Sequence, residues 1–85
     1  MKKDSHNTPD YTQKYKMIGL NIAYYRKLKG LTQMQLSELV NTSRTHISNL
    51  EAPNEPTRPS LDLLFRIADV LEVPVTYLLE FHTMA

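Results

Sequence analysis

Residues 32–51 read TQMQLSELVNTSRTHISNLE, and this stretch decides the fold that the rest of the chain has to support. Thr32, followed three residues later by Gln35, is the pattern of a capping box, which marks the start of a helix. Apolar residues then recur at helical spacing up to Asn41, a residue that tolerates the left-handed conformation of a tight turn. The stretch therefore begins with a short helix that stops at a turn.

A second helix follows this turn, over about residues 43–52, with Ser43 as its N-cap. Ile47 and Leu50 are three residues apart and point in the same direction. The opposite face of the helical wheel carries Thr45, Ser48 and Asn49, Arg44 lies to one side of it, and His46 lies on the other flank. Taken alone, this polar set fits an ordinary solvated helix face. It also fits a helix that lies in a DNA groove.

Composition limits the class of protein. Eighty-five residues predict one domain, and the absence of cysteine excludes disulfides and thiolate metal sites. The sequence contains neither an apolar run of membrane-spanning length nor a signal-peptide pattern, and its three histidines lack metal-ligand spacing. We therefore expect a cytoplasmic, nucleoid-associated protein without metal, cofactor or membrane contact.

The net charge of +1 is low for a DNA-binding protein, but the charges are unevenly distributed. Residues 1–30 hold seven Lys or Arg against two Asp or Glu, whereas residues 61–85 hold one against four. The basic end of the chain can lie near phosphates while the acidic end faces away. Lysines near the start of a chain also simply confer solubility.

The first thirty residues predict an arm and a long helix. Residues 1–13 are expected to be flexible or partly helical, with a possible helix start at Thr8-Pro9, and residues 14–85 form the domain. The long helix is most secure from Lys14 to Lys29 and carries two apolar stripes. The main stripe is Tyr11, Tyr15, Ile18, Ile22 and Tyr25; the second is Met17, Leu20, Tyr24 and Leu28. The second stripe needs its own partner, which can be the last helix, the arm or another subunit.

Two more helices complete the predicted domain. A proline-rich loop at residues 52–59 precedes a helix capped by Ser60, and Val73-Pro74 breaks that helix. The expected core face of this helix is Leu61, Leu64, Ile67, Ala68 and Leu71. A short last helix over about residues 75–80 is expected to pack Leu78 and Leu79 inward, and an apolar tail follows it.

The ordered pattern over about residues 17–80 resembles the phage repressor and Cro type of helix-turn-helix domain. The resemblance is carried by Ile18-Gly19, Ile22, Tyr25-Arg26-Lys27, Gly30-Leu31-Thr32-Gln33, Leu36, Ser43-Arg44, Ile47-Ser48, Leu50-Glu51, Pro59-Ser60-Leu61, Leu64, Ile67-Ala68, Leu71, Val73 and Leu78-Leu79. It implies an all-α fold, a compact five-helix bundle of the lambda-repressor-like DNA-binding type, with the helix-turn-helix at helices 2 and 3. The chain departs from the family at residues 52–59, where a shorter connection with a glycine near Pro53 is usual.

The resemblance also implies roles for particular residues. The residues assigned to base contacts are Arg44, Thr45, Ser48 and Asn49. Those assigned to the DNA backbone are Gln33, Thr42, Ser43, His46 and Arg58; Gln33 can also reach a base edge, and His46 can equally be a neutral surface residue. Glu51 falls close to the buried side of its helix, and in similar proteins the carboxylate at this position pairs with the arginine found here as Arg26.

The resulting hypothesis is a small bacterial or phage-type transcriptional regulator that binds double-stranded DNA sequence-specifically. We expect a homodimer on a palindromic operator, formed through Tyr77 and Phe81 with Tyr24 as a further candidate, although the same residues can instead complete the monomer core. The alternative is an antitoxin-like module that binds a protein partner and its own promoter. An enzyme is not expected, because no nucleophile with a base, no paired acids and no glycine-rich phosphate loop can be identified.

Overall fold

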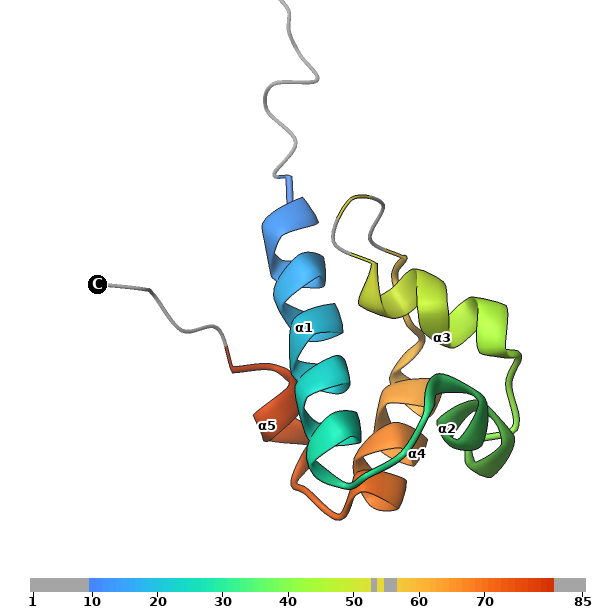
Figure 1. The fold of residues 1–85 in the computed structure, drawn as a ribbon. Coiled ribbons are helices and arrows are strands. Elements are labelled where there is room, and N and C mark those ends of the chain that lie inside the picture. Colours follow the sequence, from blue (N-terminus) through green and yellow to red (C-terminus); the bar gives the residue numbers. More distant parts are fainter. Residues whose placement is uncertain (1–9, 53, 55–56, 81–85) are drawn as a thin grey trace, which may run out of the picture.

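The computed structural model describes residues 10–52, 54 and 57–80, and the regular structure of these residues is entirely helical (Figure 1). The helices are α1 (Thr12–Leu28), α2 (Gln33–Leu39), α3 (Arg44–Glu51), α4 (Leu61–Leu71) and α5 (Val75–Leu78). The predicted all-α, five-helix architecture is confirmed, with the helix-turn-helix formed by α2 and α3.

Hydroxyl side chains begin three of these helices, as the sequence predicts. The Thr32 hydroxyl accepts a hydrogen bond from the Gln35 amide at 3.0 Å, and the Gln35 side chain accepts one from the Thr32 amide at 2.9 Å. This completes the predicted capping box. Ser43 accepts from the amide of His46, and Ser60 accepts from the amide of Leu63. Local sequence thus sets the first turns of α2, α3 and α4.

Left-handed residues end three of the helical segments. Asn41 adopts a φ of 61° between α2 and α3, which confirms the predicted turn. Gly30, with a φ of 80°, turns the chain between α1 and α2. Glu72 has a φ of 61° at the end of α4, one residue before the predicted break at Val73-Pro74. Pro74 serves instead as the N-cap of α5.

The start of α1 differs from the predicted helix start at Thr8-Pro9. The helix begins at Thr12, and Asp10 and Tyr11 before it are not helical. Thr8 and Pro9 themselves lie outside the described residues. The Asp10 carboxylate accepts a hydrogen bond from the Thr12 amide at 2.9 Å and thereby satisfies one of the free amides of the first turn.

Apolar side chains from all five helices form one buried core. Its members are Ile18, Ile22, Leu36, Val40, Ile47, Leu50, Leu63, Leu64, Ile67, Ala68, Leu71 and Leu78. The expectation for Leu61 was wrong, because it is exposed and Leu63 takes a core position. Leu61 is the first residue of α4, and a helical side chain leans toward the N-terminus, here beyond the packed part of the helix. Leu79 was also predicted to be inward but is exposed, because α5 ends at Leu78.

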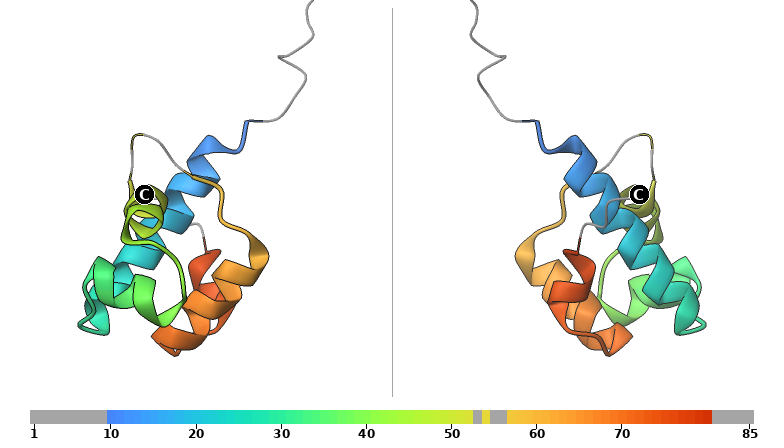
Figure 2. Two further views of the ribbon diagram at one scale, coloured as in Figure 1. Left: turned by 90° about the vertical axis from the view of Figure 1, so that its right-hand side faces the viewer. Right: turned by 90° about the vertical axis from the view of Figure 1, so that its left-hand side faces the viewer.

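Helix α1 organises the bundle, since α3, α4 and α5 all contact it (Figure 1). Its closest approach is to α3: a Cβ atom placed on Gly19 would lie 2.1 Å from the carbonyl oxygen of Leu50. Only glycine allows the two backbones to meet at this distance. Figure 2 shows the same arrangement from the two sides, with α3 beside α1, α2 packed against α3, and α4 and α5 next to each other.

Candidate nucleic-acid interface

Helix α3 divides into a buried and an exposed face. Ile47 and Leu50 are in the core, whereas Arg44, Thr45 and Asn49 are exposed. Ser48 and His46, the other two polar residues singled out on this helix, are half-buried. The exposed face therefore presents a guanidinium, a hydroxyl with a methyl group, and a carboxamide, none of which serves the core.

A buried ion pair fixes α3 on α1. Arg26 donates from Nε to Glu51 Oε2 at 2.7 Å and from Nη2 to Glu51 Oε1 at 2.9 Å. The two side chains are only 9% and 6% exposed. The remaining terminal nitrogen, Nη1, donates to the carbonyl of Leu31 at 2.7 Å, which also ties down the turn before α2. The two charges paired by the resemblance are thus joined in a bidentate contact that holds three segments together.

Gln33 connects this ion pair to the exposed face of α3. Its Nε2 donates to Glu51 Oε1 at 2.9 Å, and its Oε1 accepts a hydrogen bond from Arg44 Nη1 at 3.3 Å. A continuous chain of hydrogen bonds therefore runs from the buried Arg26 through Glu51 and Gln33 to the exposed Arg44. The family resemblance places Gln33 only at the DNA. Its bridging role was not predicted, because spacing along the chain carries no signal for a contact between residues 33 and 51.

The other polar residues around the turn already make hydrogen bonds within the chain. The Ser43 hydroxyl accepts the capping hydrogen bond from the His46 amide at 3.0 Å, and the Thr42 amide donates to the carbonyl of Ser37 at 2.9 Å. From α4, Arg66 Nε donates to the carbonyl of Val40 at 3.0 Å and so braces the end of α2. The turn is held both by its own residues and by the scaffold.

Arg58 lies apart from the Gln33–Arg44 group. Its guanidinium carbon sits 4.9 Å from the centre of the Tyr15 ring, a cation–π contact with the first half of α1. Hydrogen bonds from Thr12 hold the pKa of Asp10 below its ordinary value, and the charge of Arg58 adds to this effect. Arg58 therefore joins the loop before α4 to the start of α1.

The described part of the chain holds neither a cluster of metal ligands nor a membrane-spanning helix. Residues 10–52, 54 and 57–80 contain no group of three or more His, Cys, Asp or Glu side chains placed to hold a metal ion. Within the same residues, no helix is both long enough and apolar enough to cross a membrane.

Comparison with known proteins gives consistent matches. A family model described as helix-turn-helix matches residues 22–78. The HTH-type transcriptional regulator SinR of Bacillus subtilis (strain 168) is 38% identical over 64 residues, which cover 75% of this chain and 57% of SinR. SlrR, an HTH-type transcriptional regulator of the same organism, is 37% identical over 68 residues, which cover 80% of this chain and 44% of SlrR.

A solved structure matches the fold as well as the sequence. The crystal structure of SinR, the master regulator for biofilm formation, in complex with DNA superposes with a TM-score of 0.68 at 36% identity. The match covers 74% of this chain and 98% of that chain. The chain spans about half the length of the curated relatives that it matches.

Proposed function

The chain belongs to the helix-turn-helix family, and from this premise we propose that it binds double-stranded DNA sequence-specifically as a transcriptional regulator. The recognition element is α3, which lies in the major groove with its exposed face toward the base edges. The observation that carries the proposal is the division of α3, which buries Ile47 and Leu50 and leaves Arg44, Thr45 and Asn49 exposed. The match to a SinR chain that is bound to DNA supports it.

The roles on the exposed face follow from the chemistry of the bases. Arg44 donates two hydrogen bonds to guanine O6 and N7, and Asn49 pairs with adenine N6 and N7. Thr45 contacts a thymine methyl group or donates through its hydroxyl. Ser48, which is half-buried, reaches only a base edge that comes close to the helix.

Contacts to phosphate surround this face. Thr42, Ser43 and His46 lie around the start of α3, where free helix amides and the helix dipole favour an anion. Arg58 meets the backbone from the loop before α4, with its cation–π contact to Tyr15 setting its direction. Because the net charge is only +1, affinity rests on few phosphates and depends only moderately on salt.

Gln33 acts first as a positioning residue. Its side chain is held by Glu51 and in turn holds Arg44, so the guanidinium is oriented before it meets a base. Ordering a long side chain in the free protein lowers the entropic cost of binding. In the complex, the same amide can turn to a phosphate while the ion pair with Arg26 keeps α3 in place.

One such module contacts little DNA, so we propose that two copies act together on a two-fold symmetric site, in the cytoplasm. The two α3 helices, one from each copy, then lie in successive major grooves on the same side of the duplex. This arrangement doubles the sequence that is read without requiring a larger basic surface.

Selection of bound sequences from random duplexes, followed by titration of variants, tests the proposal. Arg44→Ala and Asn49→Ala should each weaken binding by about 1–3 kcal/mol and relax the preference at one base-pair position. Gln13→Ala, an exposed residue in the first turn of α1, is the control and should leave both properties unchanged. Unaltered affinity and preference in both α3 variants would rule out this mode of reading.

A further inference from the structure

The second apolar stripe of α1 is not covered by the fold. Leu20, Tyr24 and Leu28 follow one another at intervals of four residues, which places them on one side of the helix, and all three are exposed. We call these residues the α1 stripe. The last helix does contact α1, but it does so beside the stripe, through Asn21 and Tyr25. The sequence left the last helix, the N-terminal arm or another subunit as partners for this stripe. The structure shows that the last helix, α5, does not cover it.

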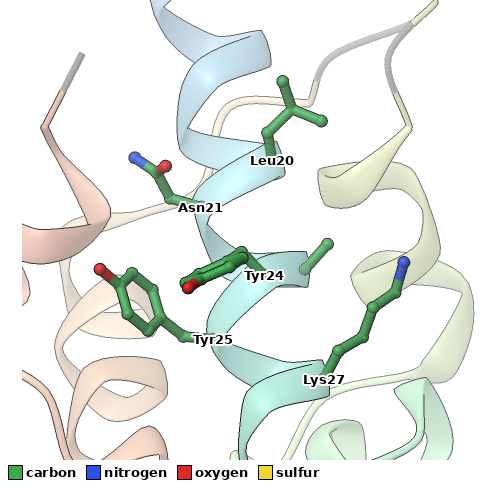
Figure 3. Close-up of a pocket in the computed structure, with 6 residues that line it drawn as sticks. Leu20, Asn21, Tyr24, Tyr25 and Lys27 are labelled. Carbon is green, nitrogen blue, oxygen red and sulfur yellow. The ribbon is translucent and has the colours of Figure 1, made fainter. Parts of the chain in front are cut away.

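The stripe borders an open cavity of about 600 Å³ (Figure 3). The cavity is lined by Leu20, Asn21, Ala23, Tyr24, Tyr25 and Lys27. Tyr25 lies between two other aromatic rings, edge-on to Tyr24 at 4.9 Å and tilted against Tyr77 of α5 at 5.9 Å. The three tyrosines thus make one aromatic surface that extends from the stripe to α5.

The polar groups at this surface favour an apolar occupant. The Asn21 amide donates to the carbonyls of Leu78 at 3.0 Å and Glu80 at 2.9 Å, so both of its donor hydrogens are used within the chain. The rings of Tyr24, Tyr25 and Tyr77 combine an apolar body with a polar tip, a type of side chain that is enriched at protein interfaces. What remains for a partner is mainly carbon surface, with the tyrosine hydroxyl groups and the Lys27 ammonium group as its polar parts.

The exposed area is sufficient for a dimer. Leu20, Tyr24 and Leu28 are 50%, 58% and 70% exposed, and Tyr77 and Leu79 of the neighbouring segment are 42% and 38% exposed. These fractions amount to roughly 500 Å² of side chain per copy, since an aromatic side chain buries about 150–250 Å². A standard interface buries about 800 Å² per partner, of which somewhat more than half is apolar. The α1 stripe together with Tyr77 and Leu79 therefore supplies the apolar area that a standard interface needs.

The position of the stripe suits a symmetric pair. Figure 1 shows α3 on one side of α1 and α5 on the other, and Figure 3 shows Tyr24 between Tyr25, on one side, and Lys27, on the other. A two-fold axis that crosses the stripe and points from α5 toward α3 sets the two stripes against each other. It also places both recognition helices on the same side of the pair, as one DNA duplex requires.

We propose that a second copy of this chain docks on the α1 stripe, together with Tyr77 and Leu79, and that side chains of the partner's stripe enter the cavity. The inference deepens the proposed function, on which it rests for the direction of the two-fold axis. It also moves the centre of the expected contact from the last helix and tail to α1. Of the residues named from the sequence, Tyr77 and Tyr24 belong to this surface, and Phe81 lies outside the described residues.

Charge insertion into the stripe tests this interface by sedimentation equilibrium of the full chain. Leu20→Glu and Tyr24→Glu should each raise the dimer dissociation constant roughly thirtyfold or more, the scale expected for the centre of an interface. Both residues are exposed in the monomer, so folding is preserved and circular dichroism checks it. Leu61→Glu is the matched control: the same substitution at an exposed leucine of α4 should leave dimerisation unchanged.

DNA titrations separate this proposal from the DNA-binding proposal. On a duplex with one half-site, Leu20→Glu should bind as well as the wild-type monomer, but on the full two-fold site it should lose the cooperative gain. Arg44→Ala should do the reverse, dimerising normally while binding either duplex weakly. Stripe variants that dimerise as tightly as wild type would overturn the interface. So would a wild-type chain that stays monomeric both free and on the full site; that outcome would leave the stripe to a different protein.

Discussion

Removal of the Glu51 carboxylate should destabilise the whole domain rather than only weaken DNA binding. Glu51→Ala deletes three hydrogen bonds, two from Arg26 and one from Gln33. It leaves the Arg26 guanidinium, in a side chain that is 9% exposed, without a counter-charge. Breaking one side of a buried pair costs about 3–5 kcal/mol. Domains are stable by about 0.05–0.15 kcal/mol per residue, which for this chain is roughly 4–13 kcal/mol, so a large share is lost.

Urea unfolding, followed by far-ultraviolet circular dichroism, measures this loss of unfolding free energy. The melting temperature should fall by at least about 12 °C. Glu51→Gln keeps the shape and one acceptor oxygen, so we expect an intermediate loss that remains measurable if the alanine variant is largely unfolded. Glu38→Ala, at an exposed glutamate of α2, should change stability by no more than about 0.5 kcal/mol.

A double variant identifies the stranded charge as the cause. Arg26→Met combined with Glu51→Leu removes both charges, and it should be more stable than Glu51→Ala alone, since buried pairs are often replaced by apolar residues without loss. Equal unfolding free energies for Glu51→Ala and Glu38→Ala would refute the reasoning. A double variant less stable than Glu51→Ala would show that the hydrogen bond from Arg26 to Leu31, which only the double variant loses, outweighs the cost of the unpaired charge.

Further substitutions, some of them matched pairs, probe other parts of the fold. Gly19→Ala gains about 1 kcal/mol in helix propensity but forces α1 away from the Leu50 carbonyl, so urea titration should show a net loss of about 2 kcal/mol or more in unfolding free energy. Gly30 has open space around it but a φ of 80°, so Gly30→Ala should lower the unfolding free energy by about 1–2 kcal/mol through backbone strain alone. A wild-type stability for Gly19→Ala would mean that the two helices separate freely. The Lys29 hydrogen bond and charge hold the pKa of Glu72 below its ordinary value, so wild type should exceed Glu72→Gln in stability at neutral pH and lose that advantage as the pH falls through the folded-state pKa; a difference that does not vary with pH would contradict this assignment. Gln33→Glu places a second carboxylate against Glu51 and should lower the melting temperature, whereas Gln35→Glu keeps the capping box and should not; equal melting temperatures would show that Gln33 does not support the ion pair.

The parts of the fold that local chemistry controls could be predicted from the sequence. Thr32, Ser43 and Ser60 each accept from an amide three residues away, and Asn41 needs only its own backbone preference, so these helix ends follow from short patterns. The two faces of α3 follow from helical periodicity. The pairing of Arg26 with Glu51 required a family resemblance, because the two residues are separated by α2 and a turn.

The remaining features depend on packing in three dimensions. The exchange of Leu61 for Leu63 in the core reflects where α4 meets its neighbours, which periodicity alone does not determine. The contact of Arg58 with Tyr15 and the bridge from Glu51 through Gln33 to Arg44 join distant segments. The second stripe of α1 could be recognised as unsatisfied, but its exposure required knowing where α5 lies.

The backbone contact at Gly19 bears on which half-site spacing a dimer of this protein would accept. With no side chain between α1 and the Leu50 carbonyl, the helix that carries the docking stripe and the helix that reads bases form one stiff body. A pair joined through the stripe would thus present its two reading helices at a separation set by the fold and not by a hinge. One base pair added at the centre of the operator rotates a half-site by about 34° and lengthens its distance, so the duplex, rather than the protein, must twist to restore the fit.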